Sequence, residues 1–239
     1  MNTIEKAVSV LKEGGIVLHP TETCYGFACD PFDKKALEKL YKLKGRDAKK
    51  PLAILVADIE MAQRYGVFDE VALDLAKKFW PGALSIVVPR QVVCSGEECH
   101  AKKFSFDGED ACFHVLPDFF NEGEGFVSMR VSSDEFSTNL VKAFGRPLVT
   151  TSANLSGEKP IYEVEVGEDG KVKGFDAVVT GEVVGGTVVG MAEGKVVAAE
   201  LIDFVVDGGK IPERKPSTVV KVENGKATVL RQGEVFVAG

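Results

Sequence analysis

The sequence of 239 residues lacks several features that would point to particular classes of protein. No apolar run approaches the roughly 18 residues that a membrane-spanning helix needs. The amino-terminal segment has no apolar block of the kind found in signal peptides, because charged residues recur every few positions. We therefore expect a cytoplasmic protein with no membrane partner.

Cysteine and histidine are also scarce, with 5 and 3 residues. The odd number and irregular spacing of the cysteines argue against a disulfide framework and favour reduced thiols. Three cysteines and two histidines fall within residues 94–114. Zinc is one interpretation of this segment, but the spacings C-x4-C-H and C-x-H match no standard zinc knuckle, and free cysteines in a surface excursion are the other. We assign no metal-ligating residue.

The net charge of −7 argues against a protein that is basic all over its surface. It still permits a local basic patch, and residues 33–50 contain eight Lys or Arg against three acidic residues. Part of this run is the solvated face of a helix. Lys44, Arg46, Lys49 and Lys50 differ, because they flank a glycine after the helix ends, where cations suit a polyphosphate. The spacing is neither a Walker A loop nor GxGxxG.

Hydrophobic periodicity predicts an alternation of helices and strands. The first helix has a capping box of Asn2 and Glu5, and Asn224-Gly225 predicts a hairpin near the carboxyl end. The pattern indicates an α/β or α+β domain with a mixed sheet. Two segments, 90–125 and about 163–200, resemble insertions. Further helices are expected at 33–43, 58–65, 69–79 and 134–144, and strands at 16–18, 27–29, 52–56, 84–88, 127–131 and 148–151.

Several polar stretches stand where a fold alone would not need them. PTETCYG at 20–26 is either a well-formed turn or a binding loop. Arg130 lies inside an apolar strand, where it needs an anion or at least an acidic partner. TTSANLSG at 150–157 follows another strand and offers hydroxyl, amide and backbone donors. Ser217 and Arg231 flank the predicted hairpin. Cys24 could be a nucleophile only if a base activated it, and apart from the nearby His19 no signal supplies one.

Taken in order, these stretches resemble the YrdC/YciO-type threonylcarbamoyl-AMP synthase family. The resembling segments cover about two-thirds of the chain, and six of them in sequence are highly specific. They are GGIVLHPTETCYGFACD, LYKLKGRDAKKPLAILVAD, FWPGALSIVV, VSMRVSSDE, RPLVTTSANLSG and PSTVVKVENGKATVLRQGEV.

The resemblance implies a single twisted YrdC-like α/β domain over residues 1–239, with a concave basic face and no separate carboxyl-terminal domain. It also implies a nucleotidyltransferase that forms threonylcarbamoyl-AMP from L-threonine, bicarbonate and ATP with Mg²⁺, and releases pyrophosphate. A tRNA-modifying transferase would receive the product, and tRNA or double-stranded RNA is a further expected partner. The alternatives are a YciO-like paralogue that binds RNA or nucleotide with little synthase activity, and a carbamoyl-transfer domain of a larger maturation protein.

The family match also assigns residues, none of them a nucleophile. Threonine would be bound by Thr23, Tyr25, Arg130 and Ser217, with Thr21 nearby. ATP would be bound by Lys44, Arg46, Lys50, Ser152, Asn154 and Arg231. Three features depart from the family pattern: Cys24 replaces a small apolar residue, Ser132 replaces a proline, and EKPIYEVEV follows SANLSG where a Ser-Pro-Thr stretch is usual. The last departure leaves one phosphate contact in doubt.

Overall fold

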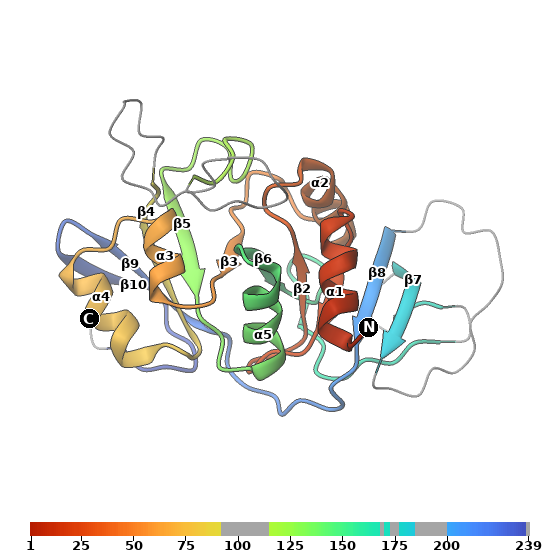
Figure 1. Ribbon diagram of the computed structural model, residues 1–239. Coiled ribbons are helices and arrows are strands. Elements are labelled where there is room, and N and C mark those ends of the chain that lie inside the picture. Colours follow the sequence, from red (N-terminus) through yellow and green to blue (C-terminus); the bar gives the residue numbers. More distant parts are fainter. Residues whose placement is uncertain (92–114, 168–169, 173–176, 185–199, 238–239) are drawn as a thin grey trace.

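The computed structural model describes residues 1–91, 115–167, 170–172, 177–184 and 200–237, and its described strands form one ten-stranded mixed sheet (Figure 1). The strand order is β10-β9-β4-β5-β3-β6-β2-β1-β8-β7. The sheet contains antiparallel pairs, such as β2 with β6, and parallel pairs, such as β3 with β5 and β4 with β9. The predicted mixed α/β architecture is therefore confirmed.

The element bounds follow the sequence prediction closely. The helices are α1 (Thr3–Lys12), α2 (Lys34–Leu43), α3 (Ile59–Tyr65), α4 (Glu70–Phe79) and α5 (Glu135–Phe144). The strands are β1 (Val17–His19), β2 (Gly26–Cys29), β3 (Ala53–Leu55), β4 (Leu84–Pro89), β5 (Phe126–Arg130), β6 (Leu148–Ser152), β7 (Ala177–Val184), β8 (Glu200–Val206), β9 (Thr218–Glu223) and β10 (Lys226–Arg231). In the described residues no helix is both long and apolar enough to cross a membrane.

Each of the five described helices begins at an asparagine or aspartate whose side chain accepts a backbone N–H of the first turn. The predicted capping box of Asn2 and Glu5 is present, with both of its hydrogen bonds at 2.9 Å. Such caps satisfy N–H groups that have no partner inside a helix. These short polar signals therefore explain why the sequence predicts the helix starts so well.

The two faces of the central strands have different surroundings. In β5, Val127 and Met129 are buried, and Met129 lies close to Gly66 at the end of α3. Side chains alternate along a strand, so Ser128 and Arg130 point to the opposite face. In Figure 1, α1, α3 and α5 lie in front of the strands. The helices thus cover one face, and the polar residues of the central strands mark the other.

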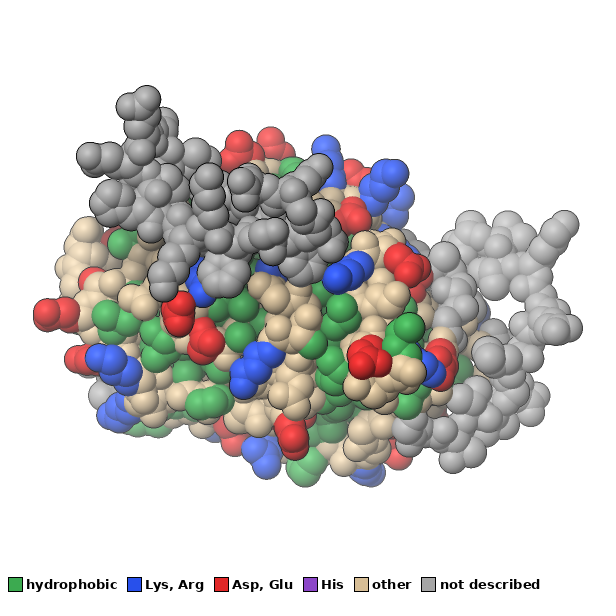
Figure 2. Space-filling view, in the orientation of Figure 1, with side chains coloured by type: hydrophobic (Ala, Val, Ile, Leu, Met, Phe, Trp, Pro, Cys, Tyr) green, Lys and Arg blue, Asp and Glu red, His purple; other side chains and the backbone are tan. Residues whose placement is uncertain are grey.

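The helix-covered side shows no large region of one charge sign. Lys and Arg side chains are interspersed there with Asp and Glu over the part of the surface in view (Figure 2). Interspersed charges are the usual state of a solvated protein surface.

Both predicted insertions contribute described structure. Segment 163–200 supplies β7, which pairs in parallel with β8 at one edge of the sheet. At the end of segment 90–125, Asn121 exchanges two hydrogen bonds of 2.8 Å with the backbone of Leu52, just before β3. Arg90 donates to the carbonyl oxygens of Phe120, Leu116 and Pro117. The Cys/His segment 94–114, for which zinc was one interpretation, lies outside the described residues.

The carboxyl-terminal hairpin has the predicted turn. β9 and β10 are antiparallel, and Asn224 and Gly225 at the turn have φ values of 53° and 74°. Positive φ at both positions is what a two-residue hairpin of this type requires. The hairpin places β9 beside β4, so that Ser217, just before β9, lies next to Ser85 of β4.

Candidate functional site

A cavity of about 690 Å³ lies on the sheet face opposite the helices. Its floor is made of small residues of the central strands, among them Ala53, Ser85, Ser128 and Thr150. Cross-strand register explains this floor, because Ala53 lies opposite both Ser128 and Thr150. Small side chains leave room above the strands for a ligand, and the size falls within the range of about 300–1,000 Å³ usual for ligand pockets.

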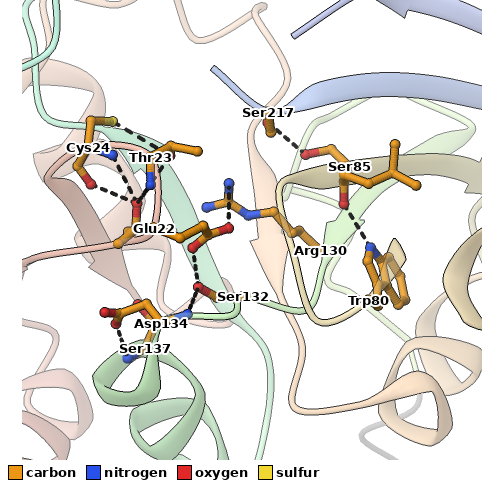
Figure 3. Close-up of polar contacts among 12 residues, drawn as sticks. Glu22, Thr23, Cys24, Trp80, Ser85, Arg130, Ser132, Asp134, Ser137 and Ser217 are labelled. Carbon is orange, nitrogen blue, oxygen red and sulfur yellow. Dashed lines mark hydrogen bonds and ion pairs between the residues drawn. The ribbon is translucent and has the colours of Figure 1, made fainter. Parts of the chain in front are cut away.

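Arg130 stands at one end of this cavity and pairs with Glu22 (Figure 3). Its Nη1 lies 3.3 Å from Oε1 of Glu22, and the two side chains are only 7% and 10% exposed. The acidic partner that the sequence left open is therefore present. Arg130 still lines the cavity, and its Nε has no hydrogen-bond partner among the described residues. The guanidinium thus keeps capacity for a further anion.

The turn that carries Glu22 is held by its own side chains. Thr21 Oγ1 donates to the carbonyl of Cys24 at 2.7 Å and lies 3.2 Å from Thr23 Oγ1. Both threonines are buried and both line the cavity. Burial raises the pKa of the Cys24 thiol, so that little thiolate is present near neutral pH. Cys24 is a poor nucleophile in this position, as its lack of a base in the sequence suggests.

Ser217 and Arg231 complete this end of the cavity. The Ser217 hydroxyl lies 3.2 Å from that of Ser85 on β4 (Figure 3). Arg231 donates from Nε and Nη2 to the Ser217 carbonyl, at 3.1 and 2.9 Å. Burial, with repulsion from Arg130, lowers the pKa of Arg231, although an arginine remains charged. Two guanidinium groups therefore share one region of the cavity without an equal number of acids.

At the opposite end of the cavity, Lys44 binds the lining residues Ser152 and Asn154 without lining the cavity itself. Its side chain is buried, and Nζ donates to the carbonyls of Ser152 and Asn154 and to Asn154 Oδ1. Asn154 Oδ1 also accepts from the Ser152 hydroxyl at 2.5 Å. Burial, helped by repulsion from Arg46, lowers the pKa of Lys44 to about 8. Lys44 thus connects the end of α2 to the turn formed by residues 152–154, which we call the SAN turn.

Arg46 follows in the same loop and lines the cavity. Its Nη2 donates to the Pro51 carbonyl at 2.9 Å, and no described acid pairs with it. A partly exposed cation held only by carbonyl oxygens is well suited to a phosphate, which can replace water around it.

The structure brings most of the predicted binding residues together. Those that line the one cavity are Thr23, Arg130, Ser217, Arg46, Ser152, Asn154 and Arg231. Tyr25, Lys44 and Lys50 are not among the lining residues. The Tyr25 hydroxyl bonds to Asp207, Gly208 and Gly209 instead, and Lys50 is exposed.

Sequence reasoning missed several residues of the lining. Arg214 and Lys221 add two cations, and Tyr162 and Asn121 add polar groups. Alternation along β9 from Ser217 could have indicated Lys221, but no local signal marked Arg214. Five cationic residues in the lining, Arg46, Arg130, Arg214, Lys221 and Arg231, stand against Glu124 and Glu158. The balance favours an anionic ligand.

Comparison with protein-family models identifies one that covers most of the chain. The Sua5/YciO/YrdC model, described as "Telomere recombination", matches residues 9–104 and 109–198. The match includes both the PTETCYG turn and the SAN turn. It ends before the hairpin of β9 and β10.

Curated relatives carry a consistent name. A threonylcarbamoyl-AMP synthase of Pseudoalteromonas translucida is 29% identical over 230 residues, which is 94% of this chain and 96% of the relative. One from Pyrococcus abyssi is 28% identical over 232 residues, 96% of this chain but only 54% of the relative. The chain therefore spans about half the length of the longer relatives.

Solved structures share the fold. The chain resembles Pyrococcus abyssi Sua5 complexed with L-threonine, with a TM-score of 0.69 and 27% identity, over 96% of this chain and 54% of that one. Escherichia coli YciO, at 21% identity and a TM-score of 0.64 over 96% and 88% of the two chains, supports the fold alone. With the family model matched over more than half of its residues, this chain belongs to the Sua5/YciO/YrdC family.

Proposed function

We propose that the protein is a threonylcarbamoyl-AMP synthase, which uses L-threonine, bicarbonate and ATP and releases pyrophosphate. The observation that carries the proposal is a single cavity lined by both the buried Arg130 and Arg46, which pairs with no acid among the described residues. An amino-acid carboxylate fits Arg130, and phosphates fit Arg46. The names of the relatives, and the L-threonine bound to one of them, support the same assignment.

The reaction suits a site without a nucleophilic side chain. The amine of threonine combines with carbon dioxide from bicarbonate to give a carbamate. A carbamate oxygen then attacks the α-phosphorus of ATP, and the bond from that phosphorus to the bridging oxygen breaks to release pyrophosphate. Such a step depends on positioning and on stabilisation of phosphate charge. Arg130, Ser217 and Thr23 would position the amino acid by its carboxylate and hydroxyl.

The phosphate end would receive the triphosphate. Arg46 is the cation best placed for it, while the Ser152 hydroxyl and the Asn154 amide lie on the turn that Lys44 fastens. Lys44 would then act by holding this turn, with its cation adding to the local field.

Mg²⁺ is expected to enter with ATP. The described residues contain no group of three or more His, Cys, Asp or Glu that could hold a metal by themselves. The oxygen donors near the SAN turn, the Ser152 hydroxyl and the Glu158 carboxylate, fit a hard ion that keeps most of its ligands from phosphate and water. When bound, the ion supplies charge neutralisation to the phosphates.

The product would pass to a tRNA-modifying transferase, because threonylcarbamoyl-AMP is an activated acyl donor. A nucleotide- or RNA-binding paralogue without synthase activity is the alternative. The excess of cations in the lining, which includes Arg214 and Lys221, favours nucleotide or RNA in either case. The buried Arg130, which lines the cavity and can bind a carboxylate, favours the enzyme.

The decisive experiment measures pyrophosphate release from ATP by the purified protein, with and without L-threonine and bicarbonate. We expect release that requires both, together with a product of the mass of threonylcarbamoyl-AMP. Release that ignores either substrate, or nucleotide binding with no release, would overturn the proposal.

A further inference from the structure

The pairing between Arg130 and Glu22 is one-sided. Nη1 of Arg130 lies 3.3 Å from Oε1 of Glu22, and this contact lacks the geometry of a hydrogen bond. Carboxylates usually engage arginine through two parallel hydrogen bonds, which is the stronger arrangement. Here both side chains are almost fully buried, yet the two-oxygen arrangement is absent. Another contact must therefore keep Oε2 of Glu22 from the guanidinium of Arg130.

Ser132 is that restraint. Its hydroxyl donates to Oε2 of Glu22, while its Oγ accepts the backbone N–H of Asp134 at 3.1 Å (Figure 3). Asp134 is in turn fixed as the N-cap of α5, where its side chain accepts the N–H of Ser137 at 2.8 Å. Ser132 is itself buried at 2% exposure. The second oxygen of Glu22 is therefore tied, through Ser132, to the start of a helix.

The Ser132 hydroxyl has a direct consequence for Arg130. Were it removed, Oε2 would lose its donor and become an unsatisfied buried acceptor, which is an unfavourable state. The nearest remedy is rotation of the carboxylate until both oxygens face the guanidinium. A bidentate pair would then occupy donors of Arg130 that a ligand carboxylate needs.

We propose that Ser132 is a positioning residue that keeps Glu22 on a single edge of Arg130, so that the guanidinium retains donors for the carboxylate of the amino-acid substrate. The inference rests on the proposed function in one respect, namely that Arg130 binds that carboxylate. It adds a role for two residues, Ser132 and Glu22, that bind no substrate themselves. Ser132 is also a position where this chain departs from the proline usual in the family it resembles.

The test is a double-mutant cycle on the purified full chain, with L-threonine binding read by calorimetry and the KM for threonine and kcat read from pyrophosphate release. Ser132→Ala should weaken threonine binding by about 3- to 10-fold, because the freed Glu22 carboxylate would compete with the substrate carboxylate for donors of Arg130. It should change kcat and the KM for ATP little. Ser132→Thr keeps a hydroxyl and should restore threonine affinity close to that of the wild type.

Glu22→Gln is the second substitution of the double-mutant cycle. The amide oxygen can still accept from a donor, but it carries no charge with which to compete for Arg130. In the Glu22→Gln background, Ser132→Ala should therefore have much less effect on threonine affinity than it has alone. Ser9→Ala serves as the matched control, because the Ser9 hydroxyl donates to Glu13 on the surface of α1, away from the Glu22 and Arg130 pair.

The outcomes separate the two proposals. If the wild type binds no L-threonine, the proposed function fails before the cycle is read. If the wild type binds threonine but Ser132→Ala binds it equally well, the positioning role is refuted. If Ser132→Ala loses affinity by the same factor in both Glu22 backgrounds, or its melting temperature and kcat fall together while affinity is kept, Ser132 is merely structural and the inference is also overturned.

Discussion

The two ends of the cavity are built in opposite ways. At the end proposed for the amino acid, Arg130 is buried against Glu22, and its position is set before any ligand arrives. At the end proposed for the phosphates, Arg46 is partly exposed, and in the described part of the chain its hydrogen bonds go to backbone carbonyls. The buried cation there is Lys44, which does not line the cavity. One end is therefore preorganised by a charge pair, and the other by a lysine that holds two loops together.

The difference reflects the ligands that each end is proposed to receive. A small amino acid offers few contacts, so an enzyme gains most from groups already fixed in place. A triphosphate carries several charges and can order flexible cations around it. We expect substitutions at the amino-acid end to be more costly and more specific than those at the phosphate end.

The largest effect should follow Arg130→Ala. Loss of the charged partner removes about 1.5–3 kcal/mol of binding to a carboxylate, so the KM for threonine should rise by about 10- to 100-fold. The KM for ATP should change far less. Steady-state pyrophosphate release at varied threonine measures both values.

The same substitution leaves Glu22 buried without its cation, which can destabilise the fold. The double variant Glu22→Gln with Arg130→Ala removes that charge and serves as the control. If the double variant regains threonine affinity close to that of the wild type, Arg130 does not bind the substrate and the comparison between the two ends fails.

Arg46→Ala should have a smaller effect, on ATP rather than on threonine. A partly exposed cation–phosphate contact contributes about 1–2 kcal/mol, so the KM for ATP should rise roughly 5- to 30-fold. Lys50→Ala is the matched control in the same loop, because the Lys50 side chain does not line the cavity. Equal losses in the two variants would show that the loop acts only through its general charge.

Lys44 should make the free energy of unfolding depend on pH. Its pKa is lowered to about 8 in the folded protein from an ordinary value of 10.5, because it is buried. Between these pH values the unfolded chain binds more protons, so this group makes the folded state more stable as pH rises. The slope is at most about 1.4 kcal/mol per pH unit.

The measurement is urea unfolding of the wild type and of Lys44→Met between pH 7 and pH 10, where the difference between the two isolates this group from other titrations. The wild type should gain stability relative to the variant as pH rises. A constant difference across the range would mean that Lys44 is not desolvated. If Lys44→Met does not fold, Lys44→Gln retains a donor for the carbonyls and provides the comparison.

The smallest effect should come from Cys24→Ala. The thiol lines the cavity, but burial raises its pKa and no described base activates it. Turnover should stay within about 2-fold of the wild type, since the substitution removes one small group that takes no part in the proposed chemistry. Loss of most activity in the alanine variant, with ATP and threonine binding intact, would give Cys24 a chemical role that the structure does not provide.

The sequence predicted the fold well because its signals are local. Capping residues such as Asn2 and Asp134 mark helix starts, and Asn224-Gly225 fixes the hairpin. Polar residues at strand ends, such as Arg130, Ser152 and Ser217, were predicted to lie together, and all three line the cavity. Each of these depends on neighbours in the chain.

The parts that sequence could not supply depend on contacts between distant residues. Lys44 and Lys50 look alike in the sequence, but Lys44 turns beneath the SAN turn, more than 100 positions away in the chain, and Lys50 stays exposed. Tyr25 lies in the binding turn, yet its hydroxyl bonds to residues 207–209. The role of Ser132 is visible only once Glu22 is brought beside it.

The most direct test of the account is a pair of titrations, of L-threonine and of a nonhydrolysable ATP analogue, into the wild type, Arg130→Ala and Arg46→Ala. If amino acid and nucleotide lie side by side in one cavity, Arg130→Ala will lose threonine affinity and largely keep the analogue, while Arg46→Ala will do the reverse. Equal losses of both ligands in both variants, or no loss in either, would contradict the two-ended site.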